Sequence, residues 1–160
     1  MRLLIISHTP HYHADGGYAG WGATVRELDY LAELFDEVVH VAPVYPGASP
    51  GGTQPYTTDR LRLRPVAPAG GESPWDKLDI LRAYPHYSRV IRHEMVRADA
   101  VHVRCPANIS LLALLLLRGA GAPPYRWVKY AGNWRPDGPE PRTYRWQRHW
   151  LDANRHGGVV

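Results

Sequence analysis

Two stretches near the amino terminus decide the fold, residues 3–7 (LLIIS) and residues 16–22 (GGYAGWG). The first is a continuous apolar run that ends in a polar residue, which is the pattern of a strand buried on both faces of a parallel sheet. The second is rich in glycine and precedes residues 24–35, where apolar side chains recur at helical spacing. Thr24 and Glu27 fit a capping box at the start of this helix. The sequence therefore predicts a strand, a glycine loop and a helix in succession.

The same alternation continues along the chain. Further strands are predicted at residues 38–44, 61–66, 100–103 and 127–131. The strand at 61–66 is expected near an edge of the sheet, because its apolar residues alternate with arginines. Further helices are predicted from Ser73 and Pro74 to about Arg97, from Asn108 to Leu117 and from Arg142 to Leu151. Pro85 is expected to break or kink the first of these helices.

This order of elements defines the fold class. Strands that alternate with helices, with glycine at the first crossover, predict an α/β protein with an open, doubly wound and mostly parallel sheet of Rossmann-like type. We expect a single domain over residues 1–160. Residues 157–160 (GGVV) have the pattern of a sixth strand that begins where the chain stops.

Composition excludes several other classes of protein. The 160 residues are 44% hydrophobic and 21% charged, as in one globular domain and unlike a disordered chain. The single Cys105 has no partner in the chain, which favours a buried thiol in a reducing compartment. The longest apolar run, residues 109–117, is too short to span a membrane, and the amino terminus lacks the pattern of a signal peptide. A cytoplasmic location is therefore expected, and the net charge of +4 suits phosphate-bearing partners or an anionic surface.

Polar residues follow three of the predicted strands. Residues 7–13 (SHTPHYH) follow the first strand, residues 104–108 (RCPAN) the fourth and residues 132–135 (GNWR) the fifth. Ligands of open α/β sheets bind outside the carboxyl ends of the strands, so these segments are expected to line one cleft.

The glycine loop has the composition of a phosphate site, since residues without side chains let backbone N–H groups approach an anion at a helix amino terminus. Its spacing is GGxxGxG and not the GxGxxG of dinucleotide-binding folds, and the second strand ends without an acidic residue for a ribose hydroxyl. This spacing disfavours a nicotinamide or flavin cofactor. The alternative is a loop whose glycines serve only a tight turn and close packing.

His8, His11 and His13, with Asp15, have the side-chain types of a zinc site. Three ligands in so short a loop would require it to bend tightly around the ion. Histidines that line a polar cleft are therefore the simpler prediction, and no metal is expected. Ser7 and His8 are not expected to act as a nucleophile and its base, because adjacent residues do not face one another.

Basic and aromatic residues are interleaved in the carboxy-terminal third, at residues 125–135 and 142–150. Such a mixture can stack nucleobases. On the predicted last helix, however, Trp146 and Trp150 share one face while Arg142, Arg145 and Arg148 fall largely elsewhere, so an amphipathic helix is the simpler prediction. Its apolar stripe is expected in the core or a domain interface, with a membrane-surface contact as the alternative. Nucleic acid is not an expected partner.

Segments along the whole chain together resemble the amino-terminal domain of GT-B glycosyltransferases, specifically the retaining group called glycosyltransferase family four. The resemblance is carried by residues 1–10 (MRLLIISHTP), the glycine pair before the first helix, residues 36–43 (DEVVHVAP), residues 98–106 (ADAVHVRCP) and residues 126–134 (RWVKYAGNW). Each motif is short, and their order makes the resemblance specific.

The resemblance implies an acceptor-side domain of an enzyme that transfers a sugar, with retention, from a nucleotide-sugar donor to a sugar or lipid-linked acceptor. It implies that the backbone amides of Gly16 and Gly17 approach the donor diphosphate. The residues assigned to acceptor binding are His8, Trp21, Asn108, Asn133, Trp134 and Arg135. The donor is a substrate, no tightly bound cofactor is implied, and no metal ion is required.

One departure from the family concerns the reaction centre. Members often end the fourth strand with a His-x-His pair, whereas this chain has His102-Val103-Arg104, and Arg104 therefore occupies the predicted catalytic position. A guanidinium is not a base at neutral pH, but it binds phosphate or a carboxylate bidentately, which favours an acidic or phosphorylated acceptor. The alternative for Arg104 is a salt bridge at the edge of the cleft. The histidine that commonly follows the fifth strand is replaced by Gly132-Asn133.

The second departure is that these residues do not include the donor domain of the family. We expect that domain in the same or a second polypeptide, and we expect this chain alone to be inactive. The open face of the cleft favours dimerisation or association with the donor domain. The basic and aromatic last helix suggests a peripheral contact at the inner face of the membrane. The alternative function is a non-catalytic α/β module that binds a phosphorylated or acidic ligand.

Overall fold

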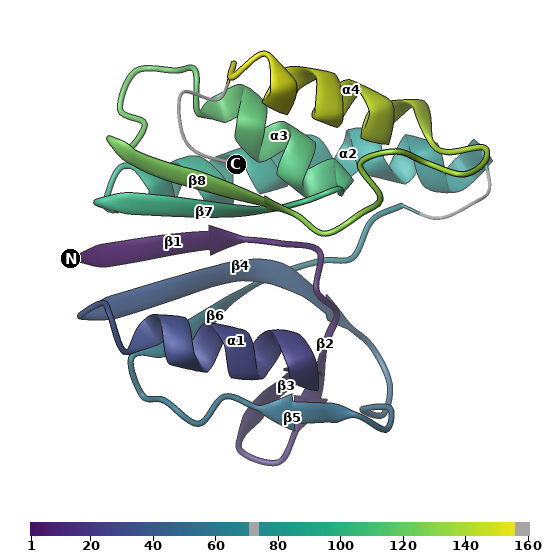
Figure 1. The fold of residues 1–160 in the computed structure, drawn as a ribbon. Coiled ribbons are helices and arrows are strands. Elements are labelled where there is room, and N and C mark those ends of the chain that lie inside the picture. The colour runs from purple at the N-terminus through teal and green to yellow at the C-terminus, as the bar shows by residue number, and fades with distance from the viewer. Residues whose placement is uncertain (71–73, 156–160) are drawn as a thin grey trace.

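The computed structural model describes residues 1–70 and 74–155, without the side chains of residues 74–78. It has the α/β architecture expected from the sequence, with an eight-stranded, mostly parallel sheet and four helices in one domain (Figure 1). The predicted strand over residues 157–160 lies outside the described residues.

Five parallel strands form the main sheet: β1 (Arg2–Ile6), β4 (Glu37–Tyr45), β6 (Leu61–Val66), β7 (Ala100–Cys105) and β8 (Tyr125–Tyr130). Their spatial order is β6-β4-β1-β7-β8, so the chain first moves to one side of β1 and later continues on the other side. All five predicted strands are confirmed. The strand order is that of a Rossmann-like sheet, and the position beside β1 where the chain changes direction is the usual place for a ligand.

Three short strands extend the sheet beyond the carboxyl end of β4. Strands β2 (His11–Ala14) and β3 (Gly17–Trp21) form an antiparallel hairpin, and β5 (Thr53–Pro55) pairs with β3. The hairpin joins the main sheet where β2 pairs with residues 44–45 of β4. The prediction of a single glycine loop between the first strand and the first helix is therefore wrong. Asp15 and Gly16 form the hairpin turn, and Gly17 begins β3. The φ of 82° at Gly16 and of 156° at Gly17 is a backbone conformation that glycine tolerates.

Helix α1 (Gly22–Ala32) begins two residues before the predicted capping box. Its first residue donates its N–H to the carbonyl of Gly52 at 2.9 Å, and no side chain caps the helix. The capping-box prediction is wrong, because Glu27 lies within the helix and pairs with Arg104 of β7. The carbonyl of Gly52, in the loop before β5, thus accepts a hydrogen bond at the start of α1, where a side-chain cap was expected.

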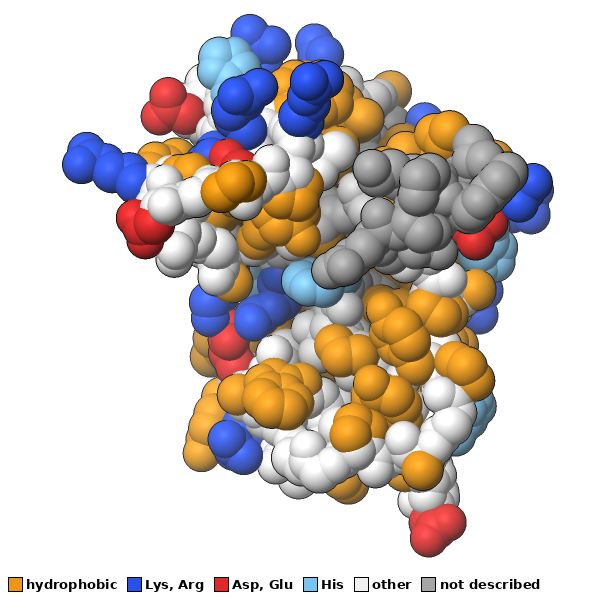
Figure 2. Space-filling view, turned by 90° about the vertical axis from the view of Figure 1, so that its right-hand side faces the viewer, with side chains coloured by type: hydrophobic (Ala, Val, Ile, Leu, Met, Phe, Trp, Pro, Cys, Tyr) orange, Lys and Arg blue, Asp and Glu red, His pale blue; other side chains and the backbone are white. Residues whose placement is uncertain are grey.

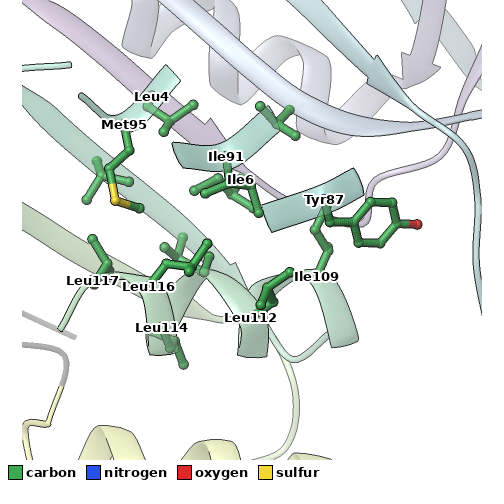
Figure 3. Close-up of a cluster of buried hydrophobic side chains, with 14 of the residues drawn as sticks. Leu4, Ile6, Tyr87, Ile91, Met95, Ile109, Leu112, Leu114, Leu116 and Leu117 are labelled. Atoms are coloured by element: carbon green, nitrogen blue, oxygen red, sulfur yellow. The ribbon is translucent and has the colours of Figure 1, made fainter. Parts of the chain in front are cut away.

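The helices lie on both faces of the sheet. Helices α2 (Pro74–Met95), α3 (Asn108–Leu116) and α4 (Arg142–Asp152) lie on one side, and α1 lies on the other (Figure 1). On the larger side, Leu4 and Ile6 of β1 pack against Ile91 of α2 and Ile109 of α3 (Figure 3). On the other side, Leu3 and Ile5 pack with Leu28 and Ala32 of α1. Strand β1 is thus buried on both faces, as its unbroken apolar sequence predicts.

Two further expectations concern single residues. Helix α2 continues through Pro85, so of the predicted break or kink the break is wrong and the kink stays a prediction. Burial of Tyr87, Ile91 and Met95 against the sheet anchors the half that follows the proline. Cys105 is a buried free thiol, as predicted, and burial raises its pKa to about 12. Among the helices within residues 1–70 and 74–155, none combines the length and the apolar character needed to cross a membrane.

Candidate functional site

A cleft of about 910 Å³ opens at the edge where the parallel strands end. Figure 2 looks onto this edge, where histidine and charged side chains gather between the upper and lower parts of the molecule. The lining comes from His8 after β1, Pro43 and Tyr45 of β4, Ala69 and Gly70 after β6, Ile80 and Tyr87 of α2, residues 107–109 at the start of α3 and residues 141–144 at the start of α4. The volume lies in the range of small-molecule sites, roughly 300–1,000 Å³.

His8 lies at the end of β1, between the buried residues Ser7 and Thr9, and its imidazole is exposed to the cleft. Loss of surrounding water lowers the pKa of His8, and the positive charge of Arg104 lowers it further. The imidazole is therefore neutral at pH 7, with one nitrogen free to accept a hydrogen bond or a proton. The prediction that His8 lines the cleft is confirmed.

A closed chain of hydrogen bonds fixes the backbone on both sides of His8. We call it the buried polar network, and its members are Ser7, Thr9, His11, His40 and Tyr56. Ser7 Oγ contacts Nε2 of His40 at 2.7 Å, and the Tyr56 hydroxyl contacts His40 Nδ1 at 2.7 Å. The same hydroxyl contacts His11 Nε2 at 2.9 Å, and His11 Nδ1 lies 2.9 Å from the carbonyl of Thr9. The N–H of Thr9 closes the chain by donating to Ser7 Oγ at 3.1 Å.

The carbonyl of Thr9 determines the direction of every bond in the buried polar network. A carbonyl only accepts, so His11 carries its proton on Nδ1 and accepts at Nε2 from the Tyr56 hydroxyl. The tyrosine oxygen must then accept from His40 Nδ1, which leaves Nε2 of His40 to accept from the Ser7 hydroxyl. Both imidazoles are neutral. Burial lowers the pKa of His11 to about 4 and holds the pKa of His40 well below its usual value, where the nearby positive charge of Arg104 acts in the same direction.

Ser7 and His40 have the distance of a nucleophile and its base, a pairing that the sequence did not reveal. Ser7 is only 1% exposed, and its oxygen already donates to His40 and accepts from Thr9. A substrate has no path to this oxygen. The pair therefore supports the loop that carries His8 and is not a hydrolytic centre.

Gly20 of β3 makes room for the buried polar network. A Cβ at this position would lie 2.6 Å from Nε2 of His11 and 3.1 Å from Cγ2 of Val25, closer than side-chain atoms approach one another. The glycine that sequence analysis assigned to a phosphate loop thus serves close packing, the alternative left open for the glycine-rich segment.

Arg104 projects from the end of β7 and is held by Glu27 of α1. Its Nη1 and Nη2 lie 2.7 Å and 3.2 Å from the two carboxylate oxygens, and Lys129 of β8 lies 2.7 Å from Oε1 of the same carboxylate. Partial burial acts to raise the pKa of Glu27, but hydrogen bonds and charges from Arg104 and Lys129 outweigh it and hold this pKa at about 2. The bidentate pair matches the salt-bridge alternative for Arg104, which does not line the cleft.

The remaining predicted residues divide into two groups. Asn108, the first residue of α3, lines the cleft with His8, as expected. Outside the lining lie Gly16 and Gly17 at the hairpin turn, Trp21 at the start of α1, and Asn133, Trp134 and Arg135 in the exposed loop after β8. Gly16 and Gly17 border a separate hollow of about 220 Å³ that shares no lining residue with the cleft. The hairpin moves these two glycines away from the start of α1, so the expected placement at a helix amino terminus is wrong.

Four residues of the cleft were not predicted from the sequence: Tyr45, Tyr87, Arg142 and Tyr144. Arg142 and Tyr144 belong to the basic and aromatic segment, but nothing in that segment indicated that the start of α4 returns to the edge of the sheet. Within the described residues, no three His, Cys, Asp or Glu side chains lie close enough to bind a metal ion together.

The fold and the cleft define an α/β protein with a Rossmann-like sheet and a ligand cleft at the carboxyl ends of its strands. Comparisons with protein-family models, with curated proteins and with solved structures found no match to this chain.

Proposed function

We propose that this chain is the acceptor-side half of a retaining glycosyltransferase that uses a nucleotide-sugar donor. The observation that carries the proposal is the cleft at the carboxyl ends of β1, β4 and β7, lined by His8 and Asn108. These two residues belong to, or directly follow, motifs in which the sequence resembles glycosyltransferase family four. The position is also the one at which sheets of this order bind their ligands.

The lining suits a sugar. The rings of Tyr45 and Tyr144 offer apolar faces, while the amide of Asn108 and the imidazole of His8 offer hydrogen bonds to hydroxyl groups. His8 is neutral at pH 7 because its pKa is lowered, so it can accept a hydrogen bond from the acceptor hydroxyl as that group attacks the donor. In this proposal the buried polar network keeps His8 in place.

Arg104 has a supporting role in this mechanism. Its bidentate pair with Glu27 joins β7 to α1, and its charge lowers the pKa values of His8 and His102. A direct contact of Arg104 with the substrate stays a prediction, as does an approach of the Gly16 and Gly17 amides to the donor diphosphate.

The donor sugar nucleotide is assigned to a second domain, in the same or another polypeptide. We therefore expect the chain alone to bind sugar nucleotides weakly and to transfer nothing. The proposal places the protein in the cytoplasm, with the exposed face of α4 at the inner surface of the membrane. Trp146, which is 47% exposed, borders a surface hollow together with Arg145 and His149, and this supports the placement.

The test is a transfer assay with a panel of nucleotide sugars, using the chain alone and with a candidate carboxy-terminal donor domain. Transfer that requires both parts, with retention at the anomeric carbon, is the expected result. His8→Ala should reduce turnover by roughly 100-fold, within the range for a positioned proton acceptor. His13→Ala is the matched control, because His13 is an exposed histidine of the hairpin outside the cleft. Equal losses in both variants, or no transfer with any donor, would reject the proposal.

A further inference from the structure

The cleft is positively charged along the part of its lining that the structure describes. Its charged or titratable side chains other than the tyrosines are Arg142 and His8, and no described lining residue is a carboxylate. A cleft that binds only neutral sugars through hydrogen bonds does not need an arginine at its wall. The lining therefore points to a ligand that carries negative charge.

Arg142 has no acidic partner among the described residues, in contrast to Arg104 and Arg148. Arg104 is paired with Glu27, and Arg148 is paired with Glu140. Among the side chains that the structure describes, those of residues 1–70 and 79–155, no carboxylate lies within ion-pairing distance of Arg142, which is the exposed first residue of α4. Its guanidinium is free to bind a ligand with two parallel hydrogen bonds.

Neighbouring groups complete a place for an anion beside Arg142. The side chain of Thr143 follows in the lining, and Asn108 begins α3 on another wall, with its Nδ2 directed toward Gly70. Helices α3 and α4 both start in the lining, and neither has a side-chain cap. Their amino ends add partial positive charge to the full charge of Arg142.

We propose that the cleft takes a phosphorylated acceptor, a sugar phosphate whose phosphate group is bound by Arg142 while its hydroxyls face His8 and Asn108. The role of this sugar phosphate as an acceptor rests on the proposed function, whereas its binding in the cleft does not. From the sequence, Arg104 was the residue expected to bind an acidic or phosphorylated acceptor. The structure pairs that arginine with Glu27 and assigns the phosphate to Arg142.

The experiment is an NMR titration of the whole chain with four probes: inorganic phosphate, a hexose 6-phosphate, the same hexose without phosphate, and uridine diphosphate. The expected result is tightest binding of the hexose 6-phosphate, at least about 10-fold tighter than the unphosphorylated hexose, as for hydrogen bonds to a charged group. Amide signals of residues 8, 108 and 142 should shift.

Three variants make the test specific to Arg142. Arg142→Gln should weaken binding of the hexose 6-phosphate by about 10-fold or more, and Arg142→Lys should restore part of it. Arg145→Gln is the matched control, one turn further along α4 with the same loss of charge and outside the cleft, and it should change binding less than twofold. Both positions are on the surface, so the three variants are expected to fold, and their spectra verify this.

Each contrary outcome overturns a stated part of the proposal. Equal binding of hexose and hexose phosphate, or equal losses in Arg142→Gln and Arg145→Gln, rejects the phosphate site. Tighter binding of uridine diphosphate than of hexose phosphate rejects the acceptor and makes the cleft a donor site. Phosphate binding without transfer in the two-part assay rejects the glycosyltransferase function and leaves the site standing, so the two failures are distinguishable.

Discussion

Acidification from pH 7.0 to 5.5 should destabilise this protein far more than its surface charge suggests. His11, His40 and His102 are buried, and burial is the first cause that lowers the pKa of each, to about 4 for His11 and His102 and well below the usual value for His40. The unfolded chain, with an ordinary histidine pKa of about 6.5, binds these protons readily. A lowered folded pKa means that stability is complete above pH 6.5 and is lost as the pH falls below it.

The magnitude follows from linkage. A histidine that stays neutral in the folded chain costs about 1.2 kcal/mol of unfolding free energy between pH 7.0 and 5.5, so three such residues cost roughly 3.6 kcal/mol. That is a large part of the roughly 5–15 kcal/mol that stabilises a typical domain. The carboxylate of Glu27, with its pKa held at about 2, adds its own loss only below about pH 4.5. The change in the free energy of unfolding between pH 7.0 and 5.5 therefore reports on the histidines and not on Glu27.

Urea unfolding followed by tryptophan fluorescence measures this effect. The free energy of unfolding should fall by roughly 3.6 kcal/mol over the interval, with an unchanged dependence on urea and an uptake of about three protons on unfolding. A loss below about 1 kcal/mol would mean that the histidines are already protonated in the folded chain, and would refute the direction assigned to the buried polar network.

Three further substitutions test the site. Gly20→Ala should lower stability by about 2 kcal/mol because its Cβ would collide with His11; Gly51→Ala, whose Cβ would meet nothing within 4 Å, is the control in thermal unfolding. Arg104→Ala should lower the free energy of unfolding by only about 1 kcal/mol, since its partner Glu27 is 39% exposed and keeps its ion pair with Lys129. If Arg104 also contacts the substrate, the same variant should reduce turnover in the two-part assay. Unchanged turnover rejects that contact. Trp146→Ala should reduce binding to vesicles of anionic lipid by about 10-fold in a sedimentation assay, and equal binding by both proteins would exclude this face as the contact.

Much of the architecture was predictable because it depends on patterns within short segments. The continuous apolar run of β1 requires burial on both faces, and the arginines that alternate along β6 require a solvated face at an edge. Helical spacing of apolar residues likewise predicted α3 and α4 close to their observed bounds. The hairpin of β2 and β3 was missed, because a glycine pair followed by a helix predicts a loop equally well.

The candidate site was predictable only where its residues directly follow a strand. His8 and Asn108 satisfy that condition, since the carboxyl ends of parallel strands meet at one edge whatever the rest of the chain does.

Contacts between distant segments were decided by tertiary structure alone. Ser7 is hydrogen-bonded to His40 and not to its neighbour His8, and Arg104 of β7 is paired with Glu27 of α1. Arg142, at the start of α4, lines the cleft. Local sequence thus determined which elements form and which edge of the sheet holds the cleft. Packing of helices against both faces of the sheet decided that Arg104 is neutralised by Glu27 and that Arg142, at the wall of the cleft, stays available to a ligand.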